Sequence, residues 1–275
     1  MTLRARLLAT ISVAAVALSM TACSGGANAD TTAKDNPYGL VQPGVLRAGT
    51  LSDAPPNVYL KDGKFTGFDN DLLTAVAAKL DLKVQFVGTE FSSLLAQVKT
   101  KKFDVGSSSI TITDARKKTV DFTDKYDFGY LGLEVPAGSS ITSFDQLKGK
   151  RVAVVQGTVQ DDYATHNGLN PVRVPDYNAA LNQLRTGTAD AWVSPAEIGE
   201  KTASESNGKI VAVAKELSEN GMAYAVAPGN DKLREALNKA LDEVIADGTW
   251  QKLEDRYYPG REIPAGFHPG SGKAS

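Results

Sequence analysis

The sequence predicts an α/β protein of two lobes, with the chain crossing twice between them. From residue 45 onward, short apolar strands alternate with amphipathic helices, a pattern that builds sheets covered by helices. Two extended segments, residues 131–135 and 222–226, are each followed by a turn of Pro, Ala and Gly and serve as the expected crossings. Residues 93–105 also resemble residues 179–191 at an offset of 86, which indicates two similarly built lobes. A chance likeness of two helix–turn–strand units is the alternative.

Composition agrees with a protein that has a substantial core. The chain has 275 residues, of which 42% are hydrophobic and 23% charged, with a formal net charge of -2. These values exclude a disordered tail, a collagen-like repeat and a basic nucleic-acid binder.

The N-terminus has the features of an export signal. Arg4 and Arg6 precede a run of apolar and small residues at 7–18, which is shorter than the roughly 20 residues needed to span a bilayer. We expect residues 1–22 to be a cleaved signal peptide. The only cysteine, Cys23, follows Met20-Thr21-Ala22, which resembles the lipobox of bacterial lipoproteins, with Met in place of the usual Leu. Cys23 is then the lipidated (palmitate-bearing) anchor to the membrane; a stray cysteine after an ordinary cleavage site is the alternative.

The first lobe begins after a tether. Residues 24–36 are small and polar, so 23–44 are expected to form the lipidated N-terminus and a flexible linker. Residues 45–49 are then a strand, and Asp69 is expected to cap a helix whose apolar residues recur at helical spacing. A strand at 83–87, a helix around 94–98 and a strand at 103–107 follow.

The second lobe repeats this alternation. Its strands are expected at 151–155, 172–174 and 189–193, and its helices at 161–166 and 179–184. A long amphipathic helix at 231–246 follows the return to the first lobe. The expected boundaries are residues 45–133 and 225–258 for lobe 1, 134–224 for lobe 2, and 259–275 for a loosely ordered tail.

Hydroxyl residues mark the expected ligand site. Ser107-Ser108-Ser109 and Ser194 stand at the ends of the two strands that resemble each other. Ligands of open α/β sheets bind beyond the carboxyl ends of the strands. We therefore expect the site between these ends.

Several short stretches occur in a specific order and spacing along the chain. They are Gly67-Phe68-Asp69, Lys102-Phe103-Asp104-Val105, Thr111-Ile112-Thr113-Asp114-Ala115-Arg116, Val120-Asp121-Phe122-Thr123, Leu147-Lys148-Gly149-Lys150, Gln156-Gly157-Thr158 and Ala246-Asp247-Gly248-Thr249. In these stretches the chain resembles, from about residue 45 to 258, the family 3 extracellular solute-binding proteins of bacterial ABC importers, the group that mostly captures polar amino acids. The resemblance implies a fold of the periplasmic binding protein type II, with two lobes on two hinge strands. It also implies a monomer that delivers a small solute to a permease and its ATPase.

The resemblance assigns roles to particular residues. Arg116 corresponds to the arginine that clamps the ligand carboxylate, a pairing that guanidinium geometry favours; a surface helix charge is the alternative. Ser109 and Thr111 correspond to positions that offer polar groups to the same ligand. Phe91 corresponds to an apolar wall, or else belongs to the core. Thr158, Val159 and Gln160 form the turn that the second lobe contributes.

Departures from the family pattern concern the ligand's ammonium group. Leu51 and Pro195 stand where many amino-acid binders carry acidic residues. Either Asp53 or Glu197 substitutes for them, with Ser194 nearby, or the ligand's amine differs. Glu197 on the outside of its helix is the alternative for that residue.

The sequence gives less support to an enzymatic function. The two histidines, His166 and His268, lack any metal-ligand pattern, and no phosphate loop, dinucleotide fingerprint or nucleophile elbow is present. We therefore expect no metal, no cofactor, no nucleic-acid partner and no catalysis. A cyclohexadienyl dehydratase-like enzyme on the same fold and a lipid-anchored sensor that presents ligand to a receptor are the alternatives.

Overall fold

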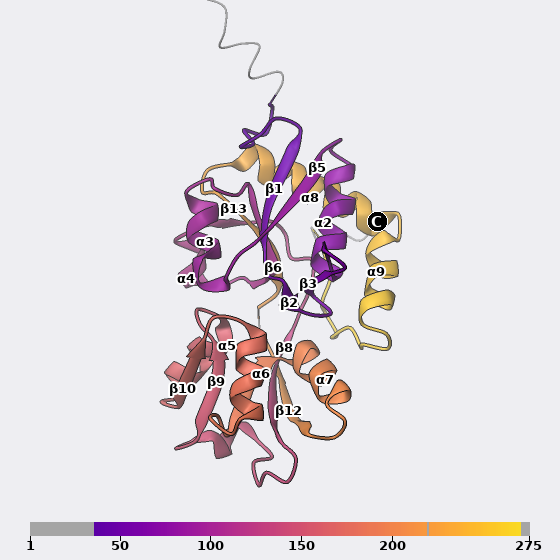
Figure 1. The fold of residues 1–275 in the computed structure, drawn as a ribbon. Helices are drawn as coiled ribbons and strands as arrows, with labels where there is room; N and C mark the ends of the chain where they lie inside the picture. The colour runs from indigo at the N-terminus through magenta and orange to yellow at the C-terminus, as the bar shows by residue number, and fades with distance from the viewer. Residues whose placement is uncertain (1–35, 219, 271–275) are drawn as a thin grey trace, which may run out of the picture.

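The computed structural model describes residues 36–218 and 220–270, which form two α/β lobes, one above the other in Figure 1. The signal segment and Cys23 lie outside the described residues. Each lobe has a five-stranded sheet, and the chain passes twice between them. The predicted fold class is confirmed.

Lobe 1 is built on a mixed sheet with helices on both faces. Its strands lie in the order β5 (Lys83–Gly88), β1 (Val45–Thr50), β6 (Val105–Thr111), β13 (Met222–Val226) and β7 (Asp121–Phe122). The first three are parallel, and β13 is antiparallel to both of its neighbours. Helices α2 (Phe68–Ala78), α8 (Asp231–Ala246) and α9 (Thr249–Tyr257) pack together on one side (Figure 1), and α3 (Phe91–Lys99) and α4 (Asp114–Lys117) lie on the other.

A small three-stranded sheet, which the sequence analysis did not anticipate, follows β1. It consists of β2 (Asp53–Ala54), β3 (Val58–Lys61) and β4 (Lys64–Thr66). It places residues 53–58 at the lower end of lobe 1 in Figure 1, where the two lobes meet.

Lobe 2 has the same strand order. Its sheet runs β10 (Asn170–Val174), β9 (Arg151–Val155), β11 (Ala191–Pro195), β8 (Tyr130–Pro136) and β12 (Ile210–Leu217). Its helices are α5 (Val159–His166), α6 (Tyr177–Arg185) and α7 (Ala196–Glu205), with a 3₁₀ turn, η1 (Phe144–Leu147). A buried apolar cluster that contains Phe91 and Val98 of lobe 1 continues to Ala180 and Trp192 of lobe 2.

The strand after each crossing belongs to the lobe that the chain is entering. β8 follows lobe 1 in the sequence but pairs with β11 and β12 of lobe 2, and β13 follows lobe 2 but pairs with β6 and β7 of lobe 1. The expected boundaries at 133/134 and 224/225 therefore fall inside strands. The described parts of the crossings are the shorter segments 123–129, 218 and 220–221, which are joined by hydrogen bonds such as that from the Ser218 N–H to the Gly129 carbonyl (2.9 Å).

The internal likeness noted in the sequence has a structural counterpart. Asp104, just before β6, accepts the Arg47 N–H of β1, and Asp190, just before β11, accepts the Arg151 N–H of β9, each at 2.8 Å. The two acids therefore fasten equivalent pairs of strands in the two lobes.

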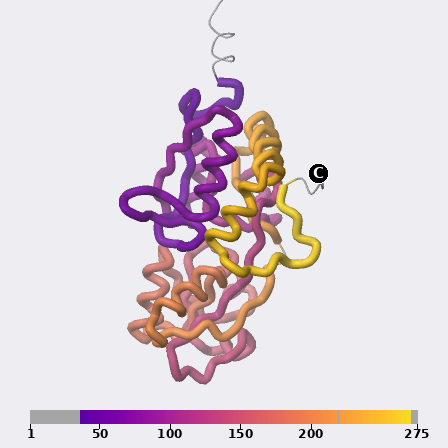
Figure 2. The backbone as a smooth tube through the Cα atoms, turned by 90° about the vertical axis from the view of Figure 1, so that its right-hand side faces the viewer, coloured from indigo at the N-terminus to yellow at the C-terminus, as the bar shows by residue number. Residues whose placement is uncertain are grey.

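Both ends of the folded part are more ordered than expected. Leu40 is buried in lobe 1, and the Val41 N–H donates to Asp104, so residues 36–44 are packed rather than a free linker. The expectation of a loosely ordered tail is wrong for residues 259–270. The yellow segment in Figure 2 turns back from α9 at the level where the lobes meet, and Phe267 packs on Phe128 at 4.8 Å between ring centroids. Among the described helices, none has the length and hydropathy to cross a membrane.

Candidate functional site

A narrow cleft lies between the lobes, at the carboxyl ends of strands from both sheets; its cavity volume is about 30 Å³, and the empty space around it, open solvent included, is about 410 Å³. Lobe 1 contributes the end of β1, the small sheet, α3, β6, α4 and β13; lobe 2 contributes the end of β11 and the first turns of α5, α6 and α7. The lining residues are Leu51, Ala54, Asn57, Val58, Phe91, Ser108, Ser109, Thr111, Arg116, Thr158, Val159, Gln160, Tyr177, Pro195, Ile198 and Met222.

Arg116 lies at the centre of this cleft. Thr113 caps α4 by accepting the Arg116 N–H at 3.2 Å, which aims the side chain back under β6. The guanidinium donates from Nη1 to the Thr111 carbonyl (2.8 Å) and from Nη2 to the Gly157 carbonyl of lobe 2 (3.1 Å). The Phe91 ring centroid is 5.0 Å from its Cζ. Arg116 therefore connects the two lobes directly.

The charge of Arg116 is buried without a counter-ion. Arg116 is only 8% exposed, and none of the ion pairs among the described residues includes it. Burial lowers the pKa of Arg116 to about 10, partly opposed by Asp162, so the group stays cationic at neutral pH. A buried cation flanked by neutral groups is a site for an anion.

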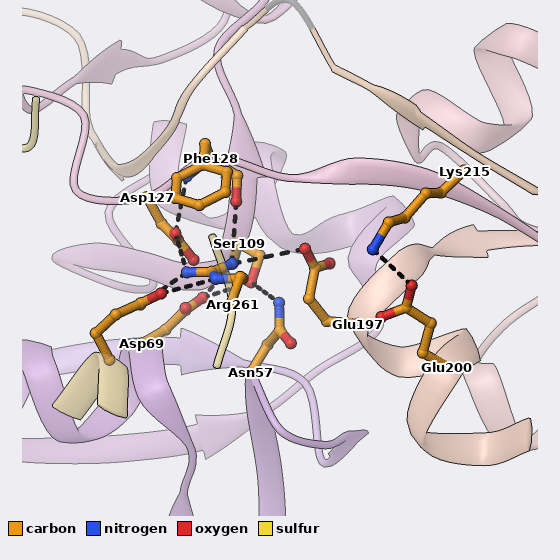
Figure 3. Close-up of polar contacts among 10 residues, drawn as sticks. Asn57, Asp69, Ser109, Asp127, Phe128, Glu197, Glu200, Lys215 and Arg261 are labelled. Carbon is orange, nitrogen blue, oxygen red and sulfur yellow. Dashed lines mark hydrogen bonds and ion pairs between the residues drawn. The ribbon is translucent and has the colours of Figure 1, made fainter. Parts of the chain in front are cut away.

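Ser109 is held by a network behind the cleft surface (Figure 3). Its Oγ donates to Asp69 Oδ2 (2.8 Å) and accepts from Asn57 Nδ2 (2.8 Å), while its N–H also donates to Asp69. Ser109 has a φ of +46°, an uncommon value for a residue with a side chain. Asp69 was expected to cap α2, but the cap position is Gly67 without a side-chain hydrogen bond, and Asp69 orients Ser109 instead.

Burial raises the pKa of Asp69 to about 6, although the hydrogen bonds from Ser109 oppose the shift. Because the folded-state pKa exceeds the ordinary value of 3.8, Asp69 stabilises the fold fully below pH 3.8, and this contribution is lost as pH rises through 6. We expect the free energy of unfolding of Asp69→Asn to fall less than that of the wild type between pH 4 and 7. Urea titrations at several pH values measure this, with the exposed Asp114→Asn as the control. Parallel pH profiles for wild type and Asp69→Asn would contradict it.

Lobe 2 contributes the turn at residues 157–160. Thr158 caps α5 by accepting the Asp161 N–H at 3.3 Å, and its hydroxyl donates to the Val155 carbonyl at 2.7 Å. The Gly157 N–H donates to Asp161 Oδ2 at 3.1 Å, so it is not free for a ligand. This turn thus offers the Gly157 carbonyl to Arg116, while Thr158, Val159 and Gln160 line the cleft.

Two residues expected in the site lie outside the cleft lining. Asp53 Oδ2 accepts the Asn178 N–H at the start of α6 (2.8 Å), so this acid caps a helix of the opposite lobe. The Ser194 hydroxyl is buried and donates to the Pro195 carbonyl at 2.8 Å. Their neighbours, Ala54 and Pro195, line the cleft in their place.

Glu197 faces the hinge and not the ligand cleft. Its Oε1 lies 3.5 Å from Arg261 Nη1 (Figure 3), and it is absent from the cleft lining. Burial raises the pKa of Glu197. Neither Glu197 nor Asp53 therefore substitutes for the missing acids at Leu51 and Pro195.

Arg261 is the centre of a buried ionic cluster between the lobes. Its guanidinium contacts Asp127 Oδ1 (2.6 Å) in the first crossing, Glu254 (2.7 and 2.8 Å) in α9 and Glu197 in α7 of lobe 2. Its Cζ lies 3.7 Å from the ring centroid of Tyr258. Burial disfavours the charged guanidinium, but Asp127 and Glu254 outweigh it and raise the pKa of Arg261.

Sequence reasoning missed several residues of the site. Asn57 and Tyr177 line the cleft from the small sheet and from the start of α6, and Ile198 and Met222 add apolar walls. The signal for Tyr177 was its place after Asp176, which caps α6 through the Ala179 N–H, because helix N-termini meet at this edge of the sheet. Asn57 carried no comparable signal.

Comparison with known proteins places the chain in a family. Residues 46–260 match the bacterial extracellular solute-binding proteins, family 3. The chain is 30% identical over 258 residues to the "Probable amino-acid-binding protein YxeM" of Bacillus subtilis (strain 168), covering 90% of this chain and 94% of that one. It is 31% identical over 229 residues to the "Lysine/arginine/ornithine-binding periplasmic protein" of Escherichia coli (strain K12), covering 78% and 88%. The structure of "An ancestral arginine-binding protein bound to arginine" has a TM-score of 0.74 and 34% identity, covering 78% of this chain and 98% of that one. The chain belongs to the family 3 bacterial extracellular solute-binding proteins.

Proposed function

We propose that this protein captures a small carboxylate-bearing solute, an amino acid or a close analogue, outside the cell membrane and delivers it to the permease and ATPase of an ABC importer. The observation that carries the proposal is Arg116, a buried cation in the interlobe cleft without a carboxylate partner among the described residues. A ligand carboxylate would offset the cost of burying this charge. Relatives named for amino acids support the solute class.

Binding and lobe closure are coupled through contacts that exist only when the lobes meet. Lobe 1 offers Arg116 and Phe91 to the ligand, and lobe 2 offers Thr158, Gln160 and Tyr177. A ligand that touches both lobes stabilises the closed arrangement more than the open one, and only that difference shifts the equilibrium. The permease must then separate the lobes, with ATP hydrolysis supplied by its partner.

A thermal-shift screen of amino acids and related organic acids tests the proposal. A true ligand at 100 times its dissociation constant stabilises the protein by about 2.7 kcal/mol. We expect one or more carboxylates to raise the melting temperature, and uncharged amides of the same compounds to have no effect. Equal stabilisation by the amides would contradict a role for the carboxylate.

Binding is better supported than catalysis. One structural neighbour is "the ancestral amino acid-binding protein AncCDT-1, a precursor of cyclohexadienyl dehydratase", at 31% identity and a TM-score of 0.72. In the described lining of the cleft, however, the only ionisable side chains are Arg116 and Tyr177, and burial raises the pKa of Tyr177 above its ordinary value. Neither group moves a proton readily near pH 7. Turnover of prephenate or arogenate would favour the enzyme.

Membrane attachment through Cys23 is part of the same proposal. The residues before Cys23 resemble a lipobox, and the polar stretch after it would tether the lobes to the membrane. Mass spectrometry of the mature N-terminus is expected to find an acylated cysteine, and an unmodified Cys23 would contradict it.

A separate assay distinguishes import from a sensor role. Ligand-dependent stimulation of the importer's ATPase would favour import.

Asp53 provides a further test because it joins the lobes without touching the cleft. We expect Asp53→Ala to weaken ligand binding by about two- to thirtyfold, since losing a helix cap costs about 0.5–2 kcal/mol and this cap forms only when the lobes meet. Isothermal titration calorimetry measures the change. Asp176→Ala is the matched control, because Asp176 caps the same helix from within lobe 2. An equal loss of affinity in both variants would contradict the interlobe role.

A further inference from the structure

The charge that lines the cleft is of one sign, positive, and this limits which solutes can bind there. Among its described lining residues, Arg116 is the only permanent charge, and no Asp or Glu is present. The rest of the lining is uncharged, and about half of it is apolar, including Leu51, Ala54, Val58, Phe91, Ile198 and Met222. Such a lining offers nothing to neutralise a second positive charge on a ligand.

We propose that the cleft selects small carboxylates with an uncharged tail and discriminates against cationic amino acids, and that Asn57 Oδ1 accepts the hydrogen-bond donor on the ligand's α-carbon. This inference rests on the proposed function, because it concerns the same cleft. It separates this chain from relatives named for lysine, arginine and ornithine.

Three of the nearby acids are engaged elsewhere, and Asp162, which acts on Arg116 through its charge, does not line the cleft. Asp53 caps α6, Glu197 lies against Arg261, and Asp69 is fully buried behind Ser109, which donates to it. Leu51 is fixed at the end of β1 by a hydrogen bond from its N–H to Ser108 Oγ (3.0 Å). A cationic side chain would thus be desolvated beside Arg116 without a counter-charge.

Asn57 supplies the acceptor that the acids do not. Because the Ser109 hydroxyl proton is donated to Asp69, Ser109 Oγ must accept from Asn57, which fixes the orientation of the amide. Asn57 Oδ1 is then an acceptor, and it is buried without a partner in the structure. A buried acceptor left unpaired is costly, and an α-ammonium or α-hydroxyl of the ligand would satisfy it.

Calorimetry with four probes tests the proposal: L-leucine, 2-hydroxy-4-methylpentanoate, 4-methylpentanoate and L-arginine. We expect L-leucine or the hydroxy acid to bind best, 4-methylpentanoate to bind at least tenfold more weakly because it lacks the α-donor, and L-arginine to bind at least a hundredfold more weakly. Preference for L-leucine assigns the donor to an ammonium, and preference for the hydroxy acid assigns it to a hydroxyl. L-Arginine binding as tightly as the better of the two would overturn the inference but leave the proposed function standing. Failure of all four probes to bind, while another carboxylate raises the melting temperature in the thermal-shift screen, would overturn the inference and leave the proposed function standing; failure of every carboxylate in that screen would overturn both.

A matched pair of variants tests the charge argument independently. Pro195 lines the cleft and occupies the position that caps α7, where Asp and Asn are equally well suited. We expect Pro195→Asp to improve L-arginine binding at least tenfold relative to Pro195→Asn, because only the former adds a carboxylate. Equal affinity of the two variants for L-arginine would contradict the proposal.

A second variant pair addresses the acceptor. Asn57→Leu removes Oδ1, so we expect the preference for an α-donor over 4-methylpentanoate to shrink at least fivefold. Val58→Leu, an apolar change at the neighbouring lining position, is expected to keep the preference. An unchanged preference in folded Asn57→Leu would overturn the assignment of Asn57.

Discussion

Arg116→Ala is expected to lower the affinity for the carboxylate solute by more than a hundredfold. Removing one partner of a buried, hydrogen-bonded charge pair costs about 3–5 kcal/mol, and each 1.4 kcal/mol is a factor of ten in affinity. The variant also loses the hydrogen bond to the Gly157 carbonyl, which joins the lobes. Calorimetry with the solute identified by the thermal-shift screen measures the loss.

Two further variants distinguish charge from geometry at this position. Arg116→Lys keeps the charge but cannot pair with a carboxylate through two parallel hydrogen bonds, so an intermediate loss is expected. Lys117→Ala, on the same helix but with its side chain 57% exposed, is expected to bind normally. Unchanged affinity in Arg116→Ala would reject the proposed carboxylate site.

Arg261→Met is expected to destabilise the whole fold by about 3–5 kcal/mol, because it leaves Asp127 and Glu254 buried without their cation. In the wild type, burial raises the pKa of Asp127 and the charge of Arg261 partly offsets this rise. In the variant that offset is lost, so the pKa of Asp127 is higher than in the wild type. A folded-state pKa raised further means stability that is lost as pH rises. The difference between variant and wild type should therefore grow with pH.

Chemical denaturation at several pH values measures this effect. Arg256→Met is the matched control, because Arg256 lies on the preceding helix with a side chain that is 65% exposed, and its loss should cost less than about 1 kcal/mol. A comparable cost in the two variants would show that the buried cluster adds nothing to stability.

Residues at strand ends were predictable from sequence, because the alternation of strands and helices determines which edge of the sheet they share. Ser109 lines the cleft for this reason, whereas Arg116, on α4, was expected there from the family resemblance. Asp53 and Ser194 do not line the cleft, although each adjoins a lining residue. Successive side chains of an extended segment point to opposite faces, so an error of one position moves a residue from the cleft to the other side.

Other features depended on contacts between distant parts of the chain. Arg261 follows Pro259 and Gly260, a composition that indicates a loose tail, yet its partner Asp127 lies 134 positions earlier. The orientation of the Asn57 amide depends on its hydrogen bond to Ser109, 52 residues away. Local patterns carry no information about such pairs, so the hinge cluster and the α-donor acceptor could be found only in three dimensions.

The pairing of β13 with the strands of lobe 1 sets an order in which the two sheets can be completed. Every strand of the lobe 2 sheet lies within residues 130–217, so that sheet is complete as a continuous stretch. The lobe 1 sheet is incomplete until β13 pairs between β6 and β7. The ion pair with Asp127 in the first crossing also requires Arg261, close to the end of the described residues. Distant pairings of this kind form slowly. Lobe 1 therefore cannot finish folding until nearly the whole described chain is available. Lobe 2, which is inserted into lobe 1, can fold without the segments that follow it.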